Sequence, residues 1–262
     1  MDIKSNINAI GIIPARFSSE RLPGKPLVDI CGKPLIRRVW EGASTSLLIR
    51  KIYIATDDLR IAVSAENFGA DVIMTPSELP SGTDRIAYAV KSIEEEADII
   101  VNIQGDEPFI TGEILDKLLS EFAASGADVG TLVQRIDYTE ELTNPSVVKV
   151  VLSDINHAIY FSRSPVPHLR DVSLESWAAT GNHRKHIGIY AYSKAILARF
   201  TELPQSNLEK LEKLEQLRLL EAGAKYYCSE TDANLIGVDT EEDLIRVREI
   251  ISKREQDDKY FI

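Results

Sequence analysis

The amino-acid sequence predicts an α/β protein with an open, mostly parallel sheet and a smaller β-rich lobe. Short apolar runs alternate with segments of helical period over most of the chain. The first runs are apolar throughout, which is typical of strands covered on both faces. Between residues 147 and 192, strand patterns follow one another without a long helix. We expect one domain over residues 1–262, in which the β-rich part, 134–200, is a substrate and dimerisation sub-lobe of a homodimer.

The expected elements follow in chain order. The predicted strands are rich in Val, Ile and Tyr and end at turn residues: Ala9–Ile13, Lys51–Ala55, Asp71–Met74, Ile99–Ile103, Val129–Val133, Val147–Leu152, Ala158–Phe161, Ile187–Tyr192 and Lys225–Cys228. The predicted helices are Leu35–Ser46, Leu59–Phe68, Asp84–Glu95, Gly112–Ala124, Asn207–Glu221 and Thr240–Ser252. The polar stretch 162–185 has no period, and so long a loop inside a domain is usually functional or disordered.

Charge and cysteine content narrow the function classes. The chain has 30 Lys and Arg against 41 Asp and Glu, a net charge of −11, and an acidic surface repels nucleic acid and anionic lipid. The two cysteines, Cys31 and Cys228, make no disulfide framework and suit a reducing compartment. The apolar run near the N-terminus is too short for a signal-peptide core or a membrane span. We expect a cytoplasmic protein without a nucleic-acid partner or membrane insertion.

One loop carries a net positive charge although the chain as a whole is acidic. The segment PARFSSERLPGKP, residues 14–26, follows the first predicted strand and carries Arg16, Arg21 and Lys25 against Glu20. Its net charge is +2, so the rest of the chain carries −13. Ligands of open α/β sheets bind at the carboxyl ends of strands, where arginine forks and a lysine point charge suit a polyphosphate. A solvated surface loop without a ligand is the alternative interpretation.

Several common motifs are missing from the sequence. Ser19 stands where a Walker A loop has its first glycine, and Pro26 stands where that loop has Ser or Thr. Neither G-x-G-x-x-G nor the hydrolase motif G-x-S-x-G occurs. His183 and His186 have an H-x-x-H spacing, but zinc needs three or four ligands and no others lie at suitable spacing. A zinc site and a hydrolase nucleophile are therefore unsupported.

Three carboxylates stand out by their positions. Asp106 follows a predicted strand in VNIQGDEPFI, and Asp239 precedes a predicted helix in LIGVDTEEDL. Magnesium binds one or two carboxylates together with water and phosphate oxygens, so the two could share an ion; each could equally cap a helix or a turn. Glu215 lies on an apolar stripe with Leu208 and Leu211 in the predicted leucine-rich helix, where it is either paired structurally or lines a pocket.

Taken in order, these motifs resemble those of the 3-deoxy-manno-octulosonate cytidylyltransferases, also called CMP-Kdo synthetases. They are IIPARFSSERLPGKPL, IATDD, SGTDRIA, VNIQGDEP, VKVVL, YFSRSPVP, KHIGIYAY, LEKLEQLRLLE and GVDTEEDL. No single motif is decisive. Nine in the same order, over nearly the whole chain, make a chance resemblance implausible.

The resemblance implies a Rossmann-like nucleotidyltransferase sheet and the transfer of CMP from CTP to the 2-hydroxyl of Kdo, an acidic eight-carbon sugar. Pyrophosphate is released, Mg²⁺ is the cofactor, and the product serves lipopolysaccharide synthesis. The implied catalytic residues are Arg16, Lys25, Asp106 and Asp239, with the two aspartates as metal ligands. The nucleotide would be bound by Ala15, Arg16, Lys25, Ser81, Gly82, Thr83 and Arg85. The sugar would be bound by Arg21, Gln104, Arg163, His186, Tyr190, Glu215 and Gln216, with Arg163 placed to meet its carboxylate.

Other functions remain as alternatives. Asp84 stands in SGTDRIA where many members of the family carry Glu, and relatives that prefer 8-amino-Kdo share the Asp, so that sugar or another acidic sugar such as a sialic acid is one alternative. A nucleotide-binding regulator without turnover is a second, but it would not need Lys25, Asp106 and Asp239 together. A glycosyltransferase is a third, but Glu107 and Pro108 follow Asp106 where a D-x-D metal motif would continue.

Overall fold

The computed structural model describes residues 7–18 and 21–260, and for residues 257–260 it describes the backbone alone. Contacts divide this chain into two compact units, which are described separately. Within the described residues, unit 1 comprises 7, 98–101 and 117–233, and unit 2 comprises 8–18, 21–97, 102–116 and 234–260. The single domain and the 134–200 sub-lobe stay predictions.

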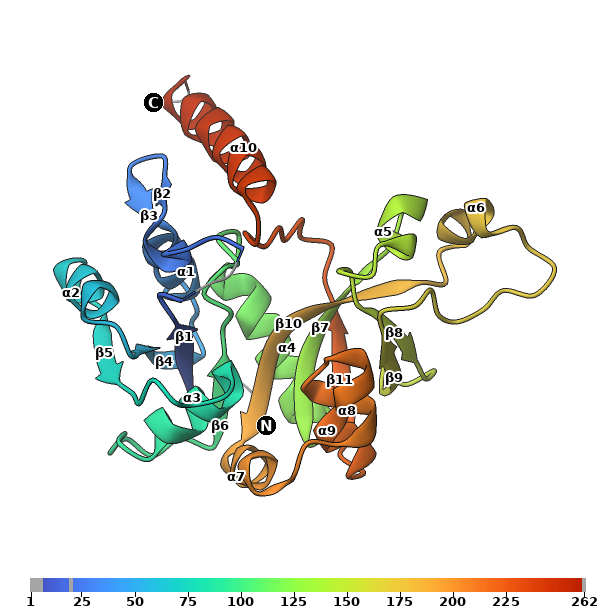
Figure 1. Ribbon diagram of the computed structural model, residues 1–262, viewed down its shortest axis with the longest axis horizontal. Helices are drawn as coiled ribbons and strands as arrows, with labels where there is room; N and C mark the ends of the chain where they lie inside the picture. Colours follow the sequence, from blue (N-terminus) through green and yellow to red (C-terminus); the bar gives the residue numbers. More distant parts are fainter. Residues whose placement is uncertain (1–6, 19–20, 261–262) are drawn as a thin grey trace. The chain divides into compact units, whose positions relative to one another are not determined.

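Unit 2 contains the first parallel strands. Its strands β1 (Ala9–Ala15), β4 (Ile49–Thr56) and β5 (Asp71–Met74) pair in the order β1-β4-β5. Figure 1 shows α1 and α2 beside these strands. Ile12, Ile13 and Ile54 are fully buried, as expected for strands covered on both faces. The other elements are η2 (Lys25–Leu27), the hairpin β2 (Asp29–Ile30) and β3 (Lys33–Pro34), and the helices α1 (Leu35–Ala43), α2 (Leu59–Asn67), α3 (Gly82–Val90) and α10 (Glu241–Tyr260).

Unit 1 is built mainly on antiparallel strands. β7 (Val129–Arg135) pairs in parallel with β11 (Tyr226–Glu230) and antiparallel with β10 (Arg184–Ser193). β8 (Lys149–Leu152) pairs antiparallel with β10 and with β9 (Ala158–Ser162). Its helices are α5 (Thr139–Thr143), α6 (Leu174–Trp177), η3 (Ala178–Thr180), α7 (Lys194–Glu202), α8 (Asn207–Glu212) and α9 (Gln216–Glu221). β6 (Ile99–Asn102) and α4 (Gly112–Ser125) contain residues of both units.

The predicted fold class is confirmed by this mixture of parallel strands and a β-rich middle segment. Every predicted strand is present, although several differ by a few residues at their ends. None of the helices in the described part of the chain combines the length and the apolar character needed to span a bilayer.

The prediction of a single helix over Asn207–Glu221 is wrong. The structure has two helices, α8 and α9, because Lys213 between them adopts a left-handed conformation with φ 55°. Arg163 donates hydrogen bonds to the carbonyl oxygens of Glu212 and Lys213 at 2.7 and 3.3 Å. These carbonyls therefore leave the helical pattern, and Leu211, expected on the apolar stripe, is 72% exposed.

The stretch 162–185 is more ordered than its sequence indicates. It contains α6 and η3, and Trp177 is buried in a small core with Ile136 and Leu142. The ring of His183 stacks on Trp177 at 5.6 Å, and its Nε2 lies 3.0 Å from the Pro167 carbonyl oxygen. The apolar residues that hold this segment lie far from it in sequence, so local periodicity could not reveal them.

Candidate active site

The cationic loop of unit 2 is closed by a backbone hydrogen bond between Phe17 and Gly24. The Gly24 amide donates to the Phe17 carbonyl at 3.0 Å. Gly24 has φ 69°, and a Cβ there would come within 3.1 Å of the Phe17 ring, so glycine fits where other residues would be strained. The Arg60 guanidinium lies 3.3 Å from the centroid of that ring. The loop delivers Lys25 to the start of η2. Ser19 and Glu20 lie outside the described residues.

Lys25 lies between the two aspartates that the sequence singled out. Its Nζ is 2.6 Å from Asp106 Oδ2 and 3.0 Å from Asp239 Oδ1. Arg21 Nη2 is 3.1 Å from Asp239 Oδ2. Burial opposes the charge of Lys25, but the attraction of Asp106 and Asp239 outweighs it and raises the pKa of the ammonium. Burial likewise opposes the charge of Asp239, and Lys25 and Arg21 reverse this and lower its pKa.

Backbone contacts bring the two aspartates together. The Val238 amide donates to the Asp106 carbonyl at 2.9 Å, which ties the segment before Asp239 to the turn after β6. Asp243 accepts from the amides of Asp239 and Thr240 at 3.1 and 2.9 Å. Thr240 Oγ1 in turn accepts from the Asp243 amide at 3.2 Å, so these residues cap α10. The cap fixes the position of Asp239.

The carboxylates fit a divalent metal ion. Asp106 and Asp239 supply hard oxygen atoms that already converge on one cation, the Lys25 ammonium. No cluster of three or more Asp, Glu, His or Cys side chains suited to a metal occurs among the described residues. Two carboxylates are what magnesium takes where substrate phosphates and water supply its other ligands. The donor set therefore suits an ion that binds together with a phosphate substrate.

The start of α3 holds the residues predicted to contact the nucleotide. Ser81 caps this helix, because its Oγ accepts from the Asp84 amide at 3.1 Å and donates to Asp84 Oδ2 at 2.7 Å. The cap fixes Gly82 and Thr83 in the first turn. Arg16 reaches the segment before it and donates to the Leu79 carbonyl. Asp84 thus has a local structural partner, which the sequence did not reveal.

Arg85 is fully buried, and two residues that sequence analysis did not select surround it. Its Nη1 donates to Thr75 Oγ1, and its Nη2 is 3.3 Å from Asp57 Oδ2. Burial lowers the pKa of the guanidinium, which Asp57 partly offsets. Within the described chain, Arg85 Nε and Asp57 Oδ1 are buried without a hydrogen-bond partner. Asp57 lies in the IATDD motif, which was the available signal for it.

The other predicted sugar-binding residues lie in unit 1 around buried aromatic rings. His186 lies edge to face with Phe161 at 5.0 Å and beside Tyr190 at 5.4 Å. The Tyr226 hydroxyl donates to the Gln216 carbonyl at 3.1 Å. Burial lowers the pKa of His186 to about 3 and raises the pKa of Tyr190 well above its usual value. These side chains are therefore neutral near pH 7.

Arg163 has contacts that the sequence did not indicate. Its guanidinium donates to the carbonyls of Glu212, Pro145 and Lys213 at 2.7, 2.9 and 3.3 Å. In this structure it holds two loops, so a contact with the sugar carboxylate stays a prediction. Gln104 lies in unit 2, where its Nε2 donates to Asn102 Oδ1 at 3.3 Å.

The predicted residues thus fall into two sets. Unit 2 contains Ala15, Arg16, Arg21, Lys25, Ser81, Gly82, Thr83, Arg85, Gln104, Asp106 and Asp239. Unit 1 contains Arg163, His186, Tyr190, Glu215 and Gln216. The first set is rich in formal charge, and the second is mainly neutral.

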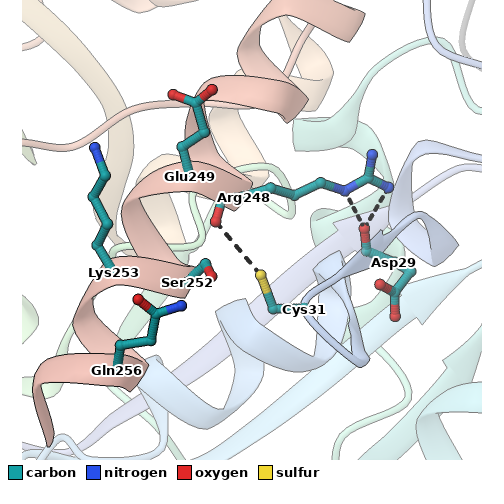
Figure 2. A pocket seen from close by; sticks show the side chains of 7 residues that line it. All are labelled: Asp29, Cys31, Arg248, Glu249, Ser252, Lys253 and Gln256. Atoms are coloured by element: carbon teal, nitrogen blue, oxygen red, sulfur yellow. Dashed lines mark hydrogen bonds between the residues drawn. The ribbon is translucent and has the colours of Figure 1, made fainter.

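A pocket of about 580 Å³ lies between α10 and the β2–β3 hairpin of unit 2. Figure 2 shows Arg248 reaching across it to Asp29, whose carbonyl oxygen accepts from Nε and Nη2 at 2.9 and 2.7 Å. Cys31 Sγ donates to the Arg248 carbonyl at 3.5 Å. None of the predicted site residues lines this pocket. Its contacts instead hold in place the helix that follows Asp239.

Comparison with known proteins agrees with this geometry. Residues 10–229 match the cytidylyltransferase family. The 3-deoxy-manno-octulosonate cytidylyltransferase of Thermodesulfovibrio yellowstonii is 45% identical over 90% of this chain and 94% of its own, and that of Chloroherpeton thalassium is 45% identical over 95% and 99%. A solved structure of CMP:2-keto-3-deoxy-manno-octonic acid synthetase complexed with CTP covers 94% of this chain and 99% of its own, with 40% identity and a TM-score of 0.87.

A more distant structure supports the fold alone. The cytidylyltransferase of Leptospira borgpetersenii is 16% identical, with a TM-score of 0.60 over 96% of each chain. The similarity to the nearer relatives extends over almost the whole chain. The chain belongs to the cytidylyltransferase family and, within it, to the 3-deoxy-manno-octulosonate cytidylyltransferases.

Proposed function

We propose that this protein transfers CMP from CTP to the 2-hydroxyl of Kdo, giving CMP-Kdo for lipopolysaccharide synthesis and releasing pyrophosphate. The observation that carries the proposal is the convergence of Asp106 and Asp239 on Lys25, next to a cationic loop. The near-full-length relatives of the same family support the choice of CTP and Kdo.

The reaction forms a bond between the sugar O2 and the α-phosphorus and breaks the bond from that phosphorus to the β-phosphate bridge. Such a transfer needs alignment and neutralisation of charge rather than a covalent nucleophile. Arg16, Arg21 and Lys25 would hold the triphosphate and stabilise the charge of the leaving pyrophosphate. To do so, the Lys25 ammonium would turn from Asp106 and Asp239 to the phosphates.

Asp106 and Asp239 would hold the metal ion, for which we propose Mg²⁺. When bound, the ion supplies a Lewis acid that neutralises phosphate charge and lowers the pKa of the attacking hydroxyl. Ser81, Gly82, Thr83 and Ala15 would bind the nucleotide, and Arg85 would support them from the core through Thr75 and Asp57.

The mainly neutral set of unit 1 would bind the sugar. His186 and Tyr190 offer hydrogen-bonding groups on an aromatic wall, and Glu215 and Gln216 lie at the start of α9. Arg163 would supply the positive charge for the sugar carboxylate. A homodimer and a cytoplasmic location remain part of this proposal.

Pyrophosphate release in the presence of CTP and Mg²⁺ tests the proposal, with Kdo, 8-amino-Kdo and a sialic acid as acceptors. We expect turnover with Kdo, a preference for CTP over the other nucleoside triphosphates, and loss of activity on chelation. Turnover with only 8-amino-Kdo or only the sialic acid would replace the proposed sugar. Tight CTP binding without pyrophosphate release from any acceptor would favour the regulator.

A further inference from the structure

Thr131 of β7 is a fully buried residue with no part in the function proposed so far. Its Oγ1 is 3.0 Å from His186 Nε2, 2.8 Å from the Ile189 carbonyl oxygen and 3.3 Å from that of Ile187. The contacts arise at an irregularity in β10, since Ile187 pairs with Leu132 while Tyr190 pairs with Thr131. Such bulges re-aim backbone and side-chain groups, often near functional sites.

The hydrogen bonds around Thr131 determine where the proton on His186 lies. A hydroxyl has one hydrogen to donate, and carbonyl oxygens only accept. If that hydrogen pointed to His186, the Ile189 carbonyl would face a hydroxyl lone pair at 2.8 Å inside the protein, which is unfavourable. The hydroxyl therefore donates to Ile189 and accepts from His186, so the imidazole carries its proton on Nε2.

The other ring nitrogen is then a hydrogen-bond acceptor. A neutral imidazole with a proton on Nε2 has a lone pair on Nδ1. Burial keeps the ring neutral by lowering its pKa to about 3. The His186 side chain is partly buried, and among the described residues no hydrogen bond to its Nδ1 is found. This nitrogen can accept a hydrogen bond from a hydroxyl group. A carboxylate has no hydrogen to donate, so its oxygen lone pairs would repel the lone pair on Nδ1.

We propose that Thr131 is a positioning residue that fixes the tautomer of His186, so that Nδ1 accepts a hydrogen bond from a sugar hydroxyl and does not bind the sugar carboxylate. The proposal rests on the proposed function for its ligand, but the tautomer itself does not. Thr131 thereby contributes to specificity for a polyhydroxylated sugar acid, although it lies behind His186 in the core.

NMR of the protein labelled with ¹⁵N-histidine tests the tautomer directly. Long-range ¹H–¹⁵N correlations identify which ring nitrogen carries the proton, and the spectrum of His186→Gln assigns the signal among the four histidines. We expect Nε2–H for His186 in the unaltered protein at pH 7. A proton on Nδ1, an average of both tautomers or a charged ring would overturn the proposal. This result stands whether or not the protein turns over Kdo.

Kinetics test the consequence for the sugar. Thr131→Val keeps the shape but removes the acceptor for Nε2–H, and we expect the KM for Kdo to rise about ten-fold. The KM for CTP and kcat should stay within about two-fold, and Thr131→Ser, which keeps the hydroxyl, should restore the KM. An unchanged KM for Kdo in Thr131→Val, or an equal loss in all three constants, would contradict the proposal. If Thr131→Val does not fold, two other results test the proposal. The spectrum of the unaltered protein must show Nε2–H for His186, and Thr131→Ser must keep the KM for Kdo.

Discussion

The candidate residues of unit 2 are held by opposite charges, whereas those of unit 1 are held mainly by neutral hydrogen bonds and rings. Lys25 has two carboxylates within 3.0 Å, while His186 has a hydroxyl and two aromatic rings. The first arrangement can exchange one cation for another as substrate binds. The second cannot change its charge near pH 7, so it suits recognition. This difference agrees with our proposal that unit 2 carries the phosphate chemistry and that unit 1 selects the sugar.

The largest effect should come from the charged set. Asp106→Asn keeps the shape but replaces a charged ligand by a weak neutral one, so we expect kcat to fall at least about a thousand-fold. Pyrophosphate release measures this, and circular dichroism checks the fold. Asp98→Asn, at an exposed aspartate, is the matched control. A variant of Asp106 with more than a tenth of the normal rate would remove its assignment as a metal ligand.

Lys25 should affect both turnover and metal binding. Lys25→Gln leaves Asp106 and Asp239 without their shared ammonium, so we expect turnover to fall about a hundred-fold. The same loss should let the carboxylates bind Mg²⁺ without CTP. Thermal unfolding with and without MgCl₂ measures this: Tm should rise in the variant and change little in the unaltered protein. Equal shifts in the two proteins would mean that the metal binds elsewhere.

The neutral set should show itself in the pH dependence of stability. The pKa of His186 is about 3 in the folded protein and about 6.5 when unfolded. Below pH 6.5 the unfolded chain binds the extra proton, so the free energy of unfolding falls as the pH is lowered from 6.5 towards 3. Urea unfolding of His186→Gln, which cannot titrate, should fall less steeply over this range. Identical slopes would mean that the His186 ring is as well hydrated in the folded protein as in the unfolded chain.

The smallest effect should come from the cap of α3. Ser81→Ala removes the acceptor for the Asp84 amide and should cost about 1 kcal/mol of unfolding free energy. Ser173→Ala is the matched control, because Ser173 precedes α6 without a side-chain cap hydrogen bond. Urea unfolding compares the two. Equal costs would show that the Ser81 contact adds nothing to the helix.

Patterns of local sequence predicted every strand except the short β2 and β3, the helices α1–α4 and α10, and the position of the charged set, but not α5, α6 or α7. Asp106 could be selected because it follows a predicted strand, and Asp239 because it precedes a predicted helix. Ligands of such sheets bind at these strand ends. The contacts that surround the predicted residues could not be predicted in this way. Asp57 and Thr75 meet Arg85 in the core, and Thr131 meets His186 through a bulge. Such partners are set by register and packing, which periodicity does not encode.

The break at Lys213 has the same origin. Asn207–Glu221 has good helix formers throughout, and its leucines favour one amphipathic helix. Arg163, almost fifty residues earlier in the chain, donates hydrogen bonds to two carbonyls that a continuous helix would use for its own backbone hydrogen bonds. A tertiary contact here overrides local propensity.

The position of a bound metal is the sharpest check on Asp106 and Asp239 as a shared metal site. Crystals grown with CTP and Mn²⁺ in place of Mg²⁺ would reveal the ion by its anomalous scattering. We expect a peak coordinated by both Asp106 and Asp239, with Lys25 moved from the carboxylates to the phosphates. A peak that touches neither aspartate, with Lys25 still paired to both, would contradict it.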